Sequence, residues 1–141
     1  MANWYGSARS NYVLVEDMQG LKDALEPFKD ISIEQGSKHG FCFIVDKNSD
    51  SGAWPSSIYL DDDRDEEVEF DPAVHITPYL EDGEILVMQE VGAEKLRYLT
   101  GYAQAFKAKT GECVGVSIES IYKLAANAFG VDVESISRAE Y

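Results

Sequence analysis

The chain has 141 residues, 45% of them hydrophobic and 11% aromatic, and a formal net charge of −14. A chain of this size and composition can bury a core, which excludes wholesale disorder and predicts a single domain over residues 1–141. The negative charge repels nucleic acid and anionic lipid and attracts basic protein surfaces, so direct binding to DNA, RNA or a membrane is disfavoured.

The cellular location and the state of the cysteines follow from simple sequence patterns. No basic start precedes a short apolar run, and no stretch approaches the ~20 apolar residues of a membrane span, so we expect a cytoplasmic protein. Cys42 and Cys113 lie in separate apolar stretches, GFCFIV and ECVGV. In a reducing compartment, we expect both to be buried free thiols.

The N-terminal third contains strand and helix patterns in turn. Residues 11–15 are rich in β-forming residues and predict a strand. Asp17 is a suitable N-cap for a helix that continues to Phe28, because apolar residues then recur at helical spacing. Residues 31–46 contain two apolar runs separated by the turn sequence QGSKHG, which predicts a hairpin.

The C-terminal half predicts further strands and a final helix. We expect a short helix within residues 72–80, a strand at residues 84–91 and a hairpin around the Thr-Gly pair at residues 110–111. Residues 117–129 carry apolar side chains at helical spacing, and Gly130 is a suitable stop. Tight turns outnumber the crossovers that a parallel sheet needs. The predicted class is therefore α+β, with a mainly antiparallel sheet packed against two helices and an acidic irregular segment in the middle.

The surplus negative charge is concentrated in the middle of the chain. Residues 46–90 contain fourteen acids and two bases, which accounts for −12 of the net −14. The regular patterns break at residues 47–71, which are rich in turn-forming residues and then strongly acidic, so we expect this segment to protrude. Its final part, EEVEFD, alternates acids with Val68 and Phe70. This pattern predicts an edge strand with carboxylates on its outer side.

The acidic segment has two interpretations. It can be a solvated loop that maintains solubility, or it can imitate the charge of DNA. Alternate carboxylates on a strand lie about 6–7 Å apart, close to the phosphate spacing along one DNA strand. The second interpretation predicts a non-enzymatic protein that binds a basic protein surface, such as that of a nucleic-acid-binding protein.

The expected partner-binding residues are eight carboxylates of this segment and two aromatic anchors beside it. They are Asp61, Asp62, Asp63, Asp65, Glu66, Glu67, Glu69, Asp71, Trp54 and Tyr59. An exposed aromatic next to a charged surface is a typical interface anchor. Glu81, Asp82 and Glu84 are expected to extend the same patch.

A module that binds divalent cations through residues 46–71 is the first alternative. Asp46, Asn48 and Asp50 have the alternate spacing that opens a calcium loop. The match then fails, because glycine occupies the seventh position and Ser57 stands where the loop requires a bidentate glutamate. We therefore expect no specific metal site and no cofactor.

A small enzyme is the second alternative. Its site would be assembled from dispersed residues around His39 or His75. The sequence contains no HExxH, no GxSxG and no glycine-rich loop of the kind that holds phosphates. A non-enzymatic role is therefore expected.

Three parts of the sequence carry a resemblance to known proteins: WYGSARSNYV at residues 4–13, the acidic centre, and GAEKLRYLTGYAQAF at residues 92–106. In size and charge the chain resembles the short acidic proteins carried by bacteriophages, plasmids and other mobile elements. Some proteins of that type, including anti-restriction and anti-CRISPR inhibitors, are DNA mimics that occupy the DNA site of a defence enzyme. The resemblance implies an anti-defence role and assigns no individual residue.

Overall fold

A computed structural model describes residues 4–36, 40–45, 51–60, 66–94 and 98–139 of the chain. These residues form three α-helices, a six-stranded antiparallel sheet and a separate two-stranded ribbon, which confirms the predicted α+β class. None of the helices in these ranges has the length and apolar character needed to cross a membrane.

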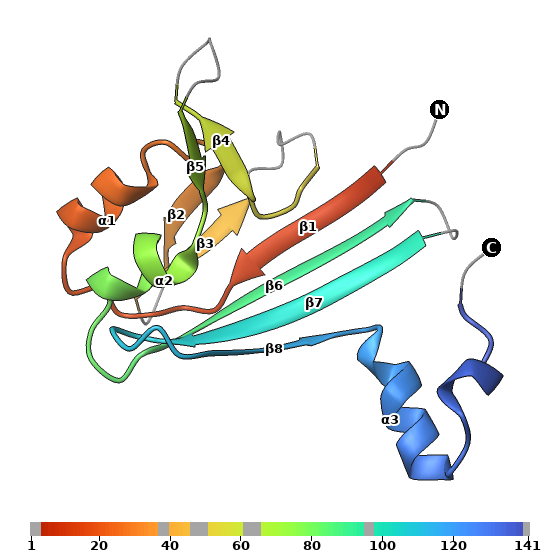
Figure 1. Cartoon of the computed structure of the whole chain (residues 1–141). Helices are drawn as coiled ribbons and strands as arrows, with labels where there is room; N and C mark the ends of the chain where they lie inside the picture. Colours follow the sequence, from red (N-terminus) through yellow and green to blue (C-terminus); the bar gives the residue numbers. More distant parts are fainter. Residues whose placement is uncertain (1–3, 37–39, 46–50, 61–65, 95–97, 140–141) are drawn as a thin grey trace.

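The main sheet has the strand order β2-β3-β1-β6-β7-β8, with antiparallel neighbours throughout (Figure 1). Its strands are β1 (Trp4–Ser10), β2 (Ile31–Gln35), β3 (Phe41–Val45), β6 (Ile85–Glu94), β7 (Tyr98–Lys107) and β8 (Cys113–Ser117). The separate ribbon consists of β4 (Ser57–Tyr59) and β5 (Glu67–Glu69). The helices are α1 (Met18–Leu25), α2 (Pro72–His75) and α3 (Ser120–Phe129), and the 3₁₀ turns are η1 (Thr77–Tyr79) and η2 (Val133–Ser135).

Local sequence explains where α1 begins and where α1 and α3 end. The Asp17 carboxylate accepts a hydrogen bond from the backbone N–H of Gly20 at 2.9 Å, which confirms Asp17 as the N-cap of α1. The helix ends at Leu25, short of the predicted Phe28, because Pro27 has no N–H with which to continue it. Gly130 ends α3 in the left-handed conformation with φ 65°, as its position predicted.

The first strand lies before the segment that was predicted. Residues 11–15 follow β1 and form only isolated bridges through Val13 and Val15. The side chain of Asn11 explains the interruption, because it donates to the backbone oxygen of Ile85 and accepts from the N–H of Val87. A short amide side chain thus takes the place of the backbone ladder at this point.

One face of the sheet carries the core, and we call it the covered face. Leu86, Met88 and Phe106 point to this side and are at most 5% exposed. They belong to one cluster with apolar residues of α1 and of the segment that contains α2 and η1. Figure 1 shows α1, α2 and the β4–β5 ribbon gathered at one end of the sheet, whereas α3 projects beyond β8.

Residues 51–54 cross the covered face beside β1. A Cβ atom on Gly6 would lie 2.2 Å from the backbone oxygen of Ser51, so the two backbones approach more closely than any side chain allows. This crossing places Trp54 in the core, where it is 9% exposed. The expectation that Trp54 is an exposed aromatic is therefore wrong.

The cysteines differ in environment. Both are free thiols, as predicted, and Cys42 is buried. Cys113 is exposed, contrary to the prediction, because it lies on β8, the last strand of the sheet, where no further strand shields it.

Candidate functional site

The β4–β5 ribbon carries the part of the predicted acidic site that the structure describes. Glu67 and Glu69 are exposed, whereas Val68 between them is half-buried and packs against the core. This alternation is the predicted one, and residues two apart on a strand lie about 6–7 Å from each other. The strand belongs to a separate ribbon that projects from the body (Figure 1). The outer side of β5 is therefore acidic.

The other predicted site residues divide into three groups. Asp61, Asp62, Asp63 and Asp65 lie outside the described residues. Glu66 is exposed, and Tyr59 is 49% exposed on β4 opposite Glu67. Asp71 is also exposed, but its carboxylate caps α2 by accepting a hydrogen bond from the N–H of Ala73 at 3.0 Å.

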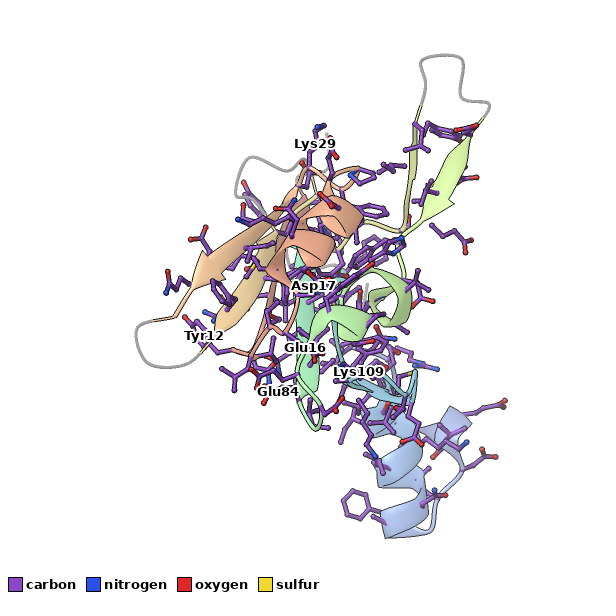
Figure 2. All side chains as sticks on the ribbon, turned by 90° about the vertical axis from the view of Figure 1, so that its left-hand side faces the viewer. Tyr12, Glu16, Asp17, Lys29, Glu84 and Lys109 are labelled. Carbon is purple, nitrogen blue, oxygen red and sulfur yellow. The ribbon has the colours of Figure 1, made fainter. Side chains whose placement is uncertain are left out.

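The acids predicted to extend the patch lie elsewhere. Glu84 and Lys109 lie together in the lower half of Figure 2, far from the ribbon at the top of that view. Asp82 is 3.2 Å from the Nζ atom of Lys109, which also contacts Glu16. The carboxylate of Glu84 accepts a hydrogen bond from the backbone N–H of Leu14. Asp82 and Glu84 thus serve local structure, and Glu81 is an exposed neighbour of Asp82, so these acids do not join the surface of β5.

Glu90, on β6, accepts two hydrogen bonds through its carboxylate. Its side chain accepts a hydrogen bond from the backbone N–H of Trp54 at 2.7 Å and another from the hydroxyl of Tyr102. Burial, and then the charge and hydrogen bond of Glu90, raise the pKa of Tyr102 to about 12. The indole N–H of Trp54 donates to the backbone oxygen of Gln89 at 3.2 Å. Trp54 thus serves as an internal anchor that fastens residues 51–54 to β6.

The two alternatives from the sequence gain no site in the described part of the chain. Asp46, Asn48, Asp50 and His39 lie outside it, and no group of three or more possible metal ligands occurs within it. His75 is described, and its ring packs against Phe28 and Phe70. Its Nδ1 atom lies 3.0 Å from the backbone nitrogen of Asp71. The surroundings of His75 are those of a structural residue.

A second surface was not predicted from the sequence. On the side opposite the covered face, paired residues of β6, β7 and β8 form an apolar surface that we call the open face. It is formed by Ile85, Val87, Gln89, Val91, Leu99, Gly101, Ala103, Ala105, Val114 and Val116. No described helix or strand covers it, and Val114 is 72% exposed. At its edge, Lys107 stands opposite Ile85, and Glu112 lines a second hollow together with Ile85 and Val114.

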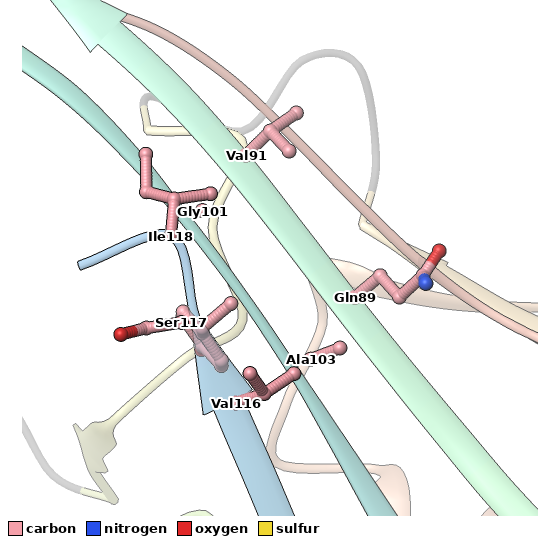
Figure 3. A pocket seen from close by; sticks show the side chains of 8 residues that line it. Gln89, Val91, Gly101, Ala103, Val116, Ser117 and Ile118 are labelled. Carbon is pink, nitrogen blue, oxygen red and sulfur yellow. The ribbon is translucent and has the colours of Figure 1, made fainter. Parts of the chain in front are cut away.

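The open face is hollowed where its side chains are small. Gly101 and Ala103 form the floor of a groove of about 390 Å³, and Val91, Val116 and Ile118 form its apolar walls (Figure 3). Strands β6 and β7 are apolar on both faces, which in a sequence is typical of a strand covered on both sides. The apolar pattern of β6 and β7 can be read from the sequence, but it does not indicate that one face of the sheet is left uncovered.

The chain was compared with protein-family models, curated proteins and solved structures. No family model, curated protein or solved structure matches the chain.

Proposed function

We propose that the protein is a non-enzymatic acidic binding protein whose partner is the basic surface of a nucleic-acid-binding protein. The observation that carries this proposal is the outer side of β5, where Glu67 and Glu69 are exposed. Among the described residues, neither forms an ion pair with a lysine or arginine. Carboxylates without a cationic partner attract a basic surface and accelerate its association.

The position of the ribbon supports the same proposal. It projects from the body of the protein, so that a partner can approach β5 (Figure 1). Tyr59 stands opposite Glu67 in the ribbon and supplies an exposed aromatic next to the charge. Residues 61–71, which include β5, contain eight acids and one base, so the sequence of the ribbon is itself strongly negative. In this proposal the ribbon competes with nucleic acid for the partner's groove, as the resemblance to mobile-element proteins implies.

Displacement of DNA tests the proposal. Purified basic DNA-binding proteins would each be loaded with fluorescent duplex DNA, and release of the DNA would be measured by anisotropy as this protein is added. We expect that this protein releases the DNA from at least one of them. The release should weaken steeply from about 50 to about 300 mM salt, because salt screens the charge attraction. Release that stays constant over this range would contradict the proposal.

A pair of matched double variants locates the binding surface. Glu67→Gln with Glu69→Gln removes two charges from the ribbon, and Glu34→Gln with Glu134→Gln removes two exposed charges elsewhere. Both change the net charge equally, so a general field effect would weaken them alike. We expect only the ribbon variant to lose most of its activity in DNA release. Equal losses would assign the effect to net charge and not to the ribbon.

A further inference from the structure

Helix α3 lacks the support that a short helix requires. It has ten residues, and isolated helices shorter than ~12–15 residues are marginally stable in water. One side of α3 is covered by the chain's own C-terminal segment, since the hydroxyl of Tyr122 accepts from the N–H of Ala139 and the guanidinium of Arg138 lies 4.3 Å from the Tyr122 ring centre. Ala126 is buried and Ala125 is half-buried, whereas the large apolar side chains on the rest of the helix surface are exposed.

These exposed side chains form a stripe on the neighbouring side of α3. Ile121, Leu124 and Ala128 recur at helical spacing and are exposed, and Leu124 is 60% exposed. Phe129, at the end of the helix, is 77% exposed. A stripe of this kind is normally buried against another element. Within the described chain no such element is present, because α3 projects away from the sheet (Figure 1).

The same end of the molecule therefore exposes an apolar helix and an apolar groove. Ile118 N–H bonds to the backbone oxygen of Gly101 at 2.9 Å, which holds the chain to the sheet until just before α3 begins at Ser120. From that point the helix continues outward, away from β6, β7 and β8 of its own sheet (Figure 1). In a pair of molecules related by a twofold axis, each helix can occupy the groove of the other.

Charge favours a second copy as the occupant. Residues 98–129 contain two acids and three bases, a net charge of +1 within a chain of −14. Two copies that meet at this end repel each other less than copies that meet through residues 46–90, which carry a net charge of −12. A strongly basic partner finds little attraction in the groove, because none of the residues that line it is a carboxylate.

The exposed apolar area of the groove and of α3 is also large enough for a stable dimer interface. Val91, Val114 and Val116 on the sheet, with Ile121, Leu124 and Phe129 on the helix, expose an area on the order of 600 Å², which is most of the ~800 Å² that each partner buries in a standard complex. We propose that the protein is a twofold symmetric homodimer in which α3 of each copy packs into the groove between β6, β7 and β8 of the other. This inference does not depend on the proposed function, because it involves the apolar end of the molecule and not the ribbon.

The mass of the full chain in solution tests the dimer. Sedimentation velocity across a range of concentrations is expected to give a dimer that persists in high salt, since apolar contacts are not screened. Leu124→Glu and Ala103→Lys are each expected to weaken dimerisation by about 100-fold or more, because each places a charge in a buried contact. Val74→Glu is the matched control, because Val74 is 58% exposed on α2, far from α3.

Mixing the variants tests the arrangement itself. Leu124→Glu and Ala103→Lys place opposite charges on the helix and in the groove, so the two variants combined are expected to form a heterodimer although neither dimerises alone. Far-UV circular dichroism would establish that each variant is folded. A monomer at all concentrations would overturn the proposal and leave the open face to a foreign protein. A dimer that survives both variants, or that Val74→Glu disrupts, would overturn it equally.

Discussion

Replacing Glu90 with alanine is expected to lower the free energy of unfolding by about 2–3 kcal/mol, because hydrogen bonds to a charged group contribute about 1.5–3 kcal/mol and this side chain accepts from both the Trp54 N–H and the Tyr102 hydroxyl. The N–H of Trp54 is partly buried, so its loss of a partner is only partly offset by water. Glu90→Gln keeps an acceptor oxygen without the charge and is expected to cost about 1 kcal/mol.

Urea unfolding followed by the fluorescence of Trp54 measures this effect directly. The second tryptophan, Trp4, is 40% exposed, and Trp4→Phe would remove its contribution from all samples. Glu69→Ala is the control, since this exposed glutamate on β5 has no ion pair in the described part of the chain, and its loss is expected to change stability by less than about 0.5 kcal/mol. If Glu90→Ala unfolded at the same urea concentration as the control, Glu90 would not fasten residues 51–54 to the sheet.

Three further predictions concern pH and local packing. The pKa of Tyr102 is raised to about 12, above its unfolded value of about 10, so the contribution of this group to the free energy of unfolding should be constant below pH ~10 and fall as the pH rises toward ~12. Urea midpoints at several pH values should therefore fall less steeply in Tyr102→Phe than in the wild type. Asp17→Ala removes the N-cap of α1 and should cost about 1 kcal/mol in the same assay, whereas Asp17→Asn should cost little. Gly6→Ala should lower the melting temperature, because its Cβ would meet the Ser51 oxygen at 2.2 Å, whereas Gly115→Ala, with its nearest neighbour at 3.4 Å, should be tolerated; equal melting temperatures would contradict the crossing of β1 by residues 51–54.

The two proposals concern opposite kinds of surface and make opposite predictions about salt. Binding through the ribbon should weaken as salt is added, because it depends on carboxylates. Association through α3 and the open face should persist, because the contact is apolar. A homodimer would also carry two acidic ribbons, and two linked sites can raise the avidity for a partner with two basic grooves.

Features governed by neighbouring residues were predictable from the sequence. The N-cap at Asp17, the left-handed glycine at Gly130 and the hairpin at residues 110–111 each depend on the conformational preference of a few adjacent residues. The alternation of Glu67, Val68 and Glu69 was also predictable, because side chains on a strand point to opposite sides whichever strand it pairs with.

Features that depend on what covers a residue were decided only by the tertiary structure. Trp54 lies in a polar, turn-rich stretch, and its burial results from the close passage of residues 51–54 beside Gly6, a contact between segments distant in sequence. The exposure of the open face has the same kind of origin. The apolar residues of β6 and β7 predict strands, but the local sequence does not show which face of the sheet packs against α1 and α2 and which face stays uncovered. A residue is buried only where two surfaces pack together. The local sequence determines how apolar one surface is, but it does not determine which other segment packs against it.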